Sequence, residues 1–86
     1  MPYRLKIESL AKKDIKSLEL TVQKRIVKKL KFFLEKPDPL MYAKKLVDSS
    51  GGDYRWRISN YRLIFDLKDY EILLLRVQHR KDVYKK

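Results

Sequence analysis

Residues 53–67 read DYRWRISNYRLIFDL, and this stretch decides the fold. Apolar residues alternate with other residues on both sides of Ser59-Asn60, and a period of two is typical of a strand with one buried face. Ser59-Asn60 is a plausible two-residue turn, which predicts a β-hairpin in which Ile58 pairs with Tyr61. Because directly opposed side chains lie on the same side of a sheet, this register assigns each residue to one face.

The hairpin register separates an apolar face from a basic one. The side chains expected to pack against helices are Tyr54, Trp56, Ile58, Tyr61, Leu63 and Phe65. Arg55, Arg57 and Arg62 then share the opposite face. Like charges opposed across strands destabilise a sheet by up to about 1 kcal/mol. Three convergent guanidinium groups therefore favour a phosphate-binding site, since arginine donors fork onto phosphate oxygens. The alternative is a face that is kept soluble, or neutralised by an acid such as Asp66.

One strand and two helices are predicted before the hairpin. Residues 3–8 alternate as a short strand. Ser9 and Thr21 are then expected to cap helices whose apolar residues recur every three or four positions. The second helix is expected to run to about Lys36, because Pro37 cannot continue it. The segment 38–50 matches neither pattern.

The last strand follows a turn near residues 68–70, and its register is open. With a three-residue turn, the core side chains are Leu73, Leu75 and Val77. That register also places Arg76 beside Arg62, whereas a two-residue turn would aim Arg76 at the core. We therefore favour the three-residue turn.

The predicted order β-α-α-β-β-β indicates an α+β fold. We expect two N-terminal helices packed on one face of a mainly antiparallel four-stranded sheet. At 86 residues, the chain is expected to form a single domain spanning residues 1–86.

Charge and composition limit the classes of function. The chain carries 22 Lys and Arg against 11 Asp and Glu, a net charge of +11. Nucleic acid is the first expected partner, and an anionic membrane or an acidic protein are the others. With no cysteine and one histidine, neither a metal nor another cofactor is expected. No signal peptide or membrane span is recognised, so we expect a cytoplasmic protein.

Cleavage of RNA without a metal needs a base near the ribose 2′-hydroxyl, an acid near the leaving 5′-oxygen and cations around the phosphorus. The hairpin arginines suit the last role. His79, Arg80 and Tyr84 follow the last strand and are candidates for proton handling or substrate contact. His79 titrates nearest neutral pH by its chemistry, and Tyr84 could alternatively stack on a base.

The runs 52–65 and 75–84, GDYRWRISNYRLIF and LRVQHRKDVY, closely resemble the RelE/ParE toxin superfamily. The resemblance covers essentially the whole chain. It implies a microbial-ribonuclease-like fold and a toxin of a type II toxin–antitoxin system. RelE-like members cleave mRNA in the ribosomal A site and leave a 2′,3′-cyclic phosphate and a 5′-hydroxyl.

The resemblance also implies roles for residues. The basic sheet positions correspond to Arg55, Arg57 and Arg62, and Arg80 would stabilise or protonate the leaving side. Tyr84 would activate the 2′-hydroxyl, with His79 as the other candidate proton acceptor. Further RNA contacts are expected from Lys44, Lys45, Arg76, Lys81, Lys28 and Lys29. Gln78 departs from the family, in which glycine is common at this position.

The expected partners are an acidic RelB-like antitoxin, the ribosome and mRNA, with a toxin that is monomeric alone and heteromeric with its antitoxin. Two alternatives stay open. ParE-like relatives share the fold and poison DNA gyrase, generally without the arginine and tyrosine set. Arg62, Arg80 and Tyr84 therefore favour the ribonuclease. The second alternative is an RNA-binding module without catalysis.

Overall fold

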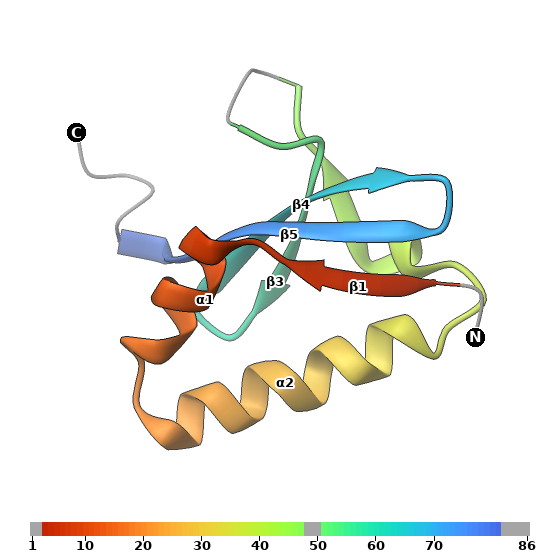
Figure 1. The fold of residues 1–86 in the computed structure, drawn as a ribbon. Helices are drawn as coiled ribbons and strands as arrows, with labels where there is room; N and C mark the ends of the chain where they lie inside the picture. Colours follow the sequence, from red (N-terminus) through yellow and green to blue (C-terminus); the bar gives the residue numbers. More distant parts are fainter. Residues whose placement is uncertain (1–2, 48–50, 82–86) are drawn as a thin grey trace.

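The computed structural model describes residues 3–47 and 51–81. Its elements are β1 (Arg4–Ile7), α1 (Ser9–Lys16), α2 (Leu20–Leu34), the 3₁₀ helix η1 (Pro39–Tyr42), β2 (Ala43–Lys45), β3 (Tyr54–Ile58), β4 (Tyr61–Lys68) and β5 (Glu71–His79). Within these residues, one five-stranded sheet has the order β1-β5-β4-β3-β2, with β1 parallel to β5 and the other pairs antiparallel. Figure 1 shows α2 running along one side of this sheet. The predicted α+β class is confirmed, with one strand more than expected.

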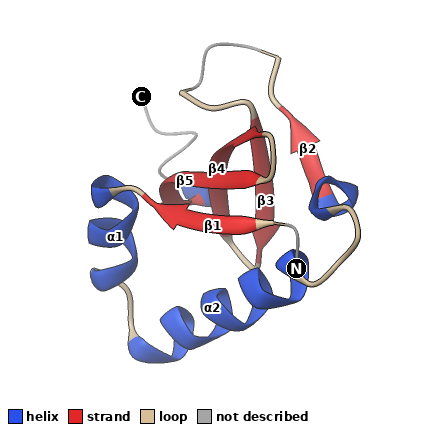
Figure 2. Cartoon of the chain, turned by 45° about the vertical axis from the view of Figure 1, so that its right-hand side comes forward, coloured by secondary structure: helices blue, strands red, loops and turns tan. Residues whose placement is uncertain are grey.

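The additional strand is β2, which lies in the segment that matched no pattern. It has only three residues, two of them exposed lysines, so no apolar alternation marks it. Tertiary contacts place it. The indole Nε1 of Trp56 donates to the carbonyl of Pro39 at 3.1 Å, which holds η1 against the core. The chain then leaves η1 with Ala43 opposite Trp56. Figure 2 shows β2 at the edge of the sheet.

The predicted hairpin register is confirmed residue by residue. The pairs are Ile58 with Tyr61, Arg57 with Arg62, Trp56 with Leu63 and Arg55 with Ile64. The helix-facing side is the core, where Phe33 of α2, Trp56 and Phe65 stack with ring centroids 4.8 and 4.0 Å apart. Burial of these large rings contributes much of the stability of so small a core. It also fixes which side of the hairpin the arginines occupy.

The expected register of β5 is wrong, since Gln78 and not Arg76 is opposite Arg62, although the predicted faces of Val77 and Arg76 are correct. Lys68 pairs with Glu71, so the turn has two residues and the buried side chains are Ile72 and Leu74. A bulge then intervenes, since Phe65 pairs with Leu74 but Ile64 pairs with Arg76. The extra residue exchanges the two faces of the strand. Val77 therefore reaches the core and Arg76 the other side, as predicted.

Both predicted helix caps are wrong, the first by one residue and the second by two. The N-cap residues are Glu8 and Glu19, not Ser9 and Thr21. In the described part of the chain, neither glutamate side chain makes a cap hydrogen bond. A carboxylate there is still favourable to the positive end of the helix dipole. Of the helices in the described ranges, none is long and apolar enough to cross a membrane.

Candidate functional site

Several cationic residues lie on the side of the sheet that faces away from the helices, and we call the group on β2, β3 and the start of β4 the arginine face. Its members are Lys44, Arg55, Arg57 and Arg62. Arg57 is directly opposite Arg62, and Lys44 is directly opposite Arg55. Opposed residues have Cβ atoms about 4.5–5.5 Å apart. The geometry thus brings the three predicted arginines together and adds one of the predicted lysines.

The arginine face is bounded by the chain that leads into β3. Ile64, which lies between Arg55 and Arg76 in the register, is 7% exposed although it is on this outer side. Gly52 packs against the Ile64 side chain, since a Cβ atom added to Gly52 would lie 2.5 Å from the Ile64 Cγ2 atom. Asp66 lies farther along β4 and accepts a hydrogen bond from the Asp53 backbone at 2.9 Å.

Arg76 is held by an acid from α1. Its Nε and Nη2 atoms donate to Asp14 Oδ2 and Oδ1 at 2.8 and 3.2 Å. The Val77 backbone N–H also donates to Asp14 Oδ2, at 2.9 Å. The hydrogen bond to Asp14 raises the pKa of Arg76 above its ordinary value, while partial desolvation opposes this rise. The charge of Arg76 is therefore compensated within the protein, and its contact with RNA stays a prediction.

His79 lies on the side of the sheet opposite to the arginine face. It pairs with Tyr61, and the two rings meet edge to face with centroids 5.0 Å apart. Its Nδ1 atom accepts a hydrogen bond from the Lys81 backbone at 3.0 Å. The Arg80 backbone donates to the carbonyl of Asn60 at 2.7 Å. Arg80 and Lys81 thus begin next to the β3–β4 turn, whereas Tyr84 lies outside the described residues.

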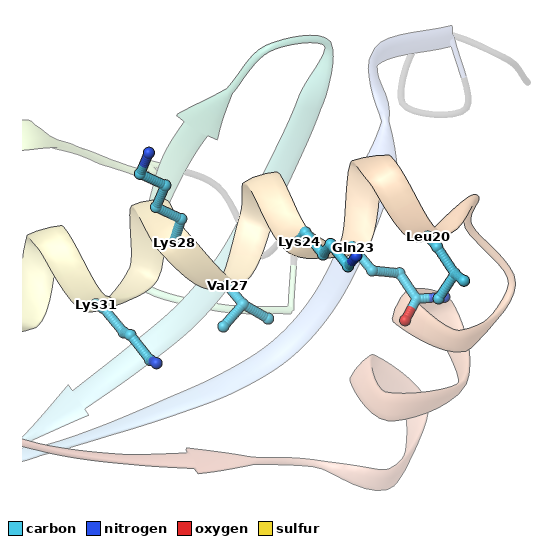
Figure 3. A pocket seen from close by; sticks show the side chains of 6 residues that line it. All are labelled: Leu20, Gln23, Lys24, Val27, Lys28 and Lys31. Carbon is cyan, nitrogen blue, oxygen red and sulfur yellow. The ribbon is translucent and has the colours of Figure 1, made fainter.

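The other lysines predicted to bind RNA are spread over the molecule. Lys28 and Lys29 belong to α2, on the far side of the sheet, and Lys28 lines a shallow groove along that helix (Figure 3). The Lys29 ammonium lies 4.8 Å from the centroid of the Phe32 ring in the same helix. Lys45 is opposite Tyr54 and therefore lies on the helix-facing side of the sheet. Only Lys44 of this group joins the arginine face within the described strands.

Sequence reasoning missed two residues around the site. Asp14 pairs with a residue 62 positions away, and no local pattern announces such a contact. Gln78 lies directly opposite Arg62 and so belongs to the edge of the arginine face. The glutamine at a position where the family commonly has glycine marked Gln78 as unusual. Its place opposite Arg62 was not predictable, because it depends on the β5 bulge, which the apolar alternation of the strand does not indicate.

Comparison with known proteins agrees with this architecture. The family model described as the ParE toxin of the type II toxin–antitoxin system parDE matches residues 5–84. The chain belongs to this toxin family. The predicted membership of the RelE/ParE superfamily is confirmed.

Relatives of this toxin carry RelE-type names. The curated protein Toxin RelG of Mycobacterium tuberculosis is 28% identical and is covered over the full length of both chains. A chain of the M. tuberculosis toxin–antitoxin complex RelBE2 superposes with a TM-score of 0.80 at 26% identity, covering 93% of this toxin and 100% of that chain. A chain of the archaeal RelE–RelB complex of Pyrococcus horikoshii superposes with a TM-score of 0.71 at 29% identity, covering 93% of this toxin and 97% of that chain.

Proposed function

We propose that this toxin is a ribosome-dependent endoribonuclease that cleaves mRNA in the A site. The ribose 2′-hydroxyl attacks the adjacent phosphorus without a metal, which gives a 2′,3′-cyclic phosphate and a 5′-hydroxyl. The observation that carries the proposal is the direct opposition of Arg57 and Arg62, with Arg55 and Lys44 on the same face. Two structural relatives above 25% identity are RelE-type toxins, which supports this branch over others.

The arginine face suits the charge that develops in this reaction. Directly opposed side chains lie close enough for two guanidinium groups to bind one phosphate. An RNA phosphate bridging Arg57 and Arg62 would accept hydrogen bonds from both. The same donors would stabilise the phosphorane, whose charge exceeds that of the ground state. In this proposal Arg80 acts on the leaving 5′-oxygen and Tyr84 on the 2′-hydroxyl.

The test maps mRNA ends on ribosomes that are stalled with an empty A site. Wild-type toxin should produce new 5′-hydroxyl ends within the A-site codon. Arg62→Ala should lower kcat by about 100- to 1000-fold, as removal of one oxyanion donor does in other enzymes. Arg4→Ala is the matched control, because Arg4 is an exposed arginine on β1, at the opposite edge of the sheet from β2. The absence of A-site cleavage by wild type, or full cleavage by Arg62→Ala combined with Tyr84→Phe, would refute the proposal.

A second candidate is inhibition of DNA gyrase, since the matching family model is that of ParE toxins. A supercoiling assay with purified gyrase separates the two functions. Inhibition without mRNA cleavage would favour the ParE-type activity. RNA binding with neither activity would instead identify a non-catalytic RNA-binding module.

We also propose that an acidic antitoxin binds this toxin. The net charge of +11 favours fast association with an acidic partner, and the relatives in the M. tuberculosis and P. horikoshii structures are in toxin–antitoxin complexes. The antitoxin is expected to cover the arginine face or to displace the segment that carries Tyr84. Amide exchange of the complex tests this, and unchanged exchange in both regions would contradict it.

A further inference from the structure

We propose that His79 is a positioning residue, whose imidazole holds the backbone of Arg80 beside the arginine face. The inference rests on the ribonuclease function proposed above, and it deepens that function by giving His79 a role other than proton transfer. It starts from three contacts at the end of β5, which come from β4, from the β3–β4 turn and from the chain beyond His79 itself.

The imidazole acts as a helix cap. Strand β5 ends at His79, and residues 80 and 81 are helical. A residue that precedes a helix caps it by accepting a hydrogen bond from the N–H two or three positions later. The His79 Nδ1 atom accepts from the Lys81 N–H at 3.0 Å, which is the second position after it. Asparagine and aspartate usually make this contact, and the Nδ1 atom stands at the same distance along the side chain as their Oδ1.

Arg80 is thereby held on both sides. Its own N–H donates to the Asn60 carbonyl at 2.7 Å, and the next N–H along the chain donates to His79. Asn60 is in the turn that joins β3 to β4, two residues before Arg62. The two bonds therefore fix where the Arg80 side chain begins relative to the arginine pair.

The same geometry argues against His79 as the proton acceptor. His79 is opposite Tyr61 on the helix-facing side, whereas the adjacent Gln78 is opposite Arg62 on the arginine face. Successive side chains of a strand point to opposite sides of the sheet. A phosphate bound by Arg57 and Arg62 would thus have the sheet between itself and the imidazole. Since Nδ1 accepts a hydrogen bond, the neutral ring carries its proton on Nε2.

Three substitutions separate the two roles. His79→Asn retains an acceptor at the Nδ1 position, His79→Gln places its amide nearer the Nε2 position, and His79→Phe keeps an aromatic ring against Tyr61 without an acceptor. Multiple-turnover cleavage of A-site mRNA at varied ribosome–mRNA concentration gives kcat and KM for each variant. We expect the asparagine variant to retain wild-type kcat within about twofold, because asparagine is a preferred cap. The phenylalanine and glutamine variants should lose about fivefold or more in kcat with little change in KM.

Amide exchange of Lys81, followed by NMR on the free toxin, provides a readout that needs no catalysis. Its protection should fall about fivefold in His79→Phe and persist in His79→Asn. Wild-type kcat in His79→Phe, unchanged exchange in that variant, or an asparagine variant as defective as phenylalanine would overturn the proposal. If wild-type toxin fails to cleave mRNA, the ribonuclease function falls, while the exchange rates still decide whether His79 caps the chain.

Discussion

Replacement of Asp14 by alanine should destabilise the protein by about 2–3 kcal/mol, although Asp14 is a partly exposed residue of a short helix. Its side chain is 18% exposed, and the carboxylate accepts from the Arg76 guanidinium and from the Val77 backbone. Strand β1 pairs with Glu71 to Leu74 of β5 and then ends. Asp14 therefore supplies an acceptor to a strand edge that β1 no longer covers.

The two bonds contribute unequally. The Arg76 side chain is 42% exposed, and ion pairs so open to solvent contribute about 0.2–1 kcal/mol. The bond to Val77 is charge-assisted, and its loss leaves the N–H of a residue that is only 5% exposed without an acceptor, which costs about 1.5–3 kcal/mol. Arg76→Ala should thus cost about 0.5 kcal/mol. Asp14→Asn should destabilise the protein more than Arg76→Ala and less than Asp14→Ala, because its amide oxygen still accepts from the Val77 N–H.

Urea unfolding followed by circular dichroism measures these differences. For a small domain, a loss of 2–3 kcal/mol moves the midpoint by about 1–2 M urea. Lys13→Ala, at an exposed neighbouring position of α1, is the control and should stay within about 0.5 kcal/mol of wild type. The reasoning fails if Asp14→Ala costs no more than Arg76→Ala, or if Asp14→Asn costs as much as alanine.

The contribution of Arg76 itself should not vary around neutral pH. Its hydrogen bond to Asp14 raises its pKa in the folded state, so folding favours the protonated guanidinium. A raised pKa gives stability that is fully present below the unfolded-state value and is lost only as pH rises through the folded-state value. For arginine that window is strongly alkaline. A difference between wild type and Arg76→Ala that changed between pH 7 and 9 would contradict this assignment.

Three further predictions concern the sheet and the core. Arg57→Thr should lower mRNA cleavage, because it removes one of two opposed guanidinium groups, while stability in urea stays within about 0.5 kcal/mol of wild type, since Arg57 is exposed; undiminished cleavage would contradict its role. Gly52→Ala should lower the free energy of unfolding by about 1–3 kcal/mol, since the new methyl group would lie 2.5 Å from the Ile64 side chain. In a double-mutant cycle, Ile64→Ala should destabilise the Gly52→Ala protein less than it destabilises wild type. Ile26→Ala, fully buried, should cost about 2–5 kcal/mol in the same assay, against less than about 0.5 kcal/mol for the exposed Val27→Ala.

The hairpin was predictable because its determinants are local. A two-residue turn and strict alternation specify the register from Tyr54 to Phe65, and with it the side on which the arginines lie. The short strand β2 was not predictable, since its pairing depends on where Trp56 holds η1. The β5 register was predictable only in part. A bulge after Leu74 adds one residue, and the alternation of apolar residues in Ile72 to Leu75 is too weak to show it.

The sequence by itself determined the α+β class, the faces of the β3–β4 hairpin and the resemblance to RelE/ParE toxins, because short-range periodicity and turn chemistry decide all three. Tertiary structure alone decided which residues share the surroundings of the arginine face. It places Lys44 and Gln78 on that face and pairs Arg76 with Asp14. It also places His79 on the other side of the sheet, where its imidazole accepts a hydrogen bond from the Lys81 backbone. These contacts depend on a bulge, a strand edge and a helix packed across it. Such features arise between segments far apart in the chain, and no local pattern records them.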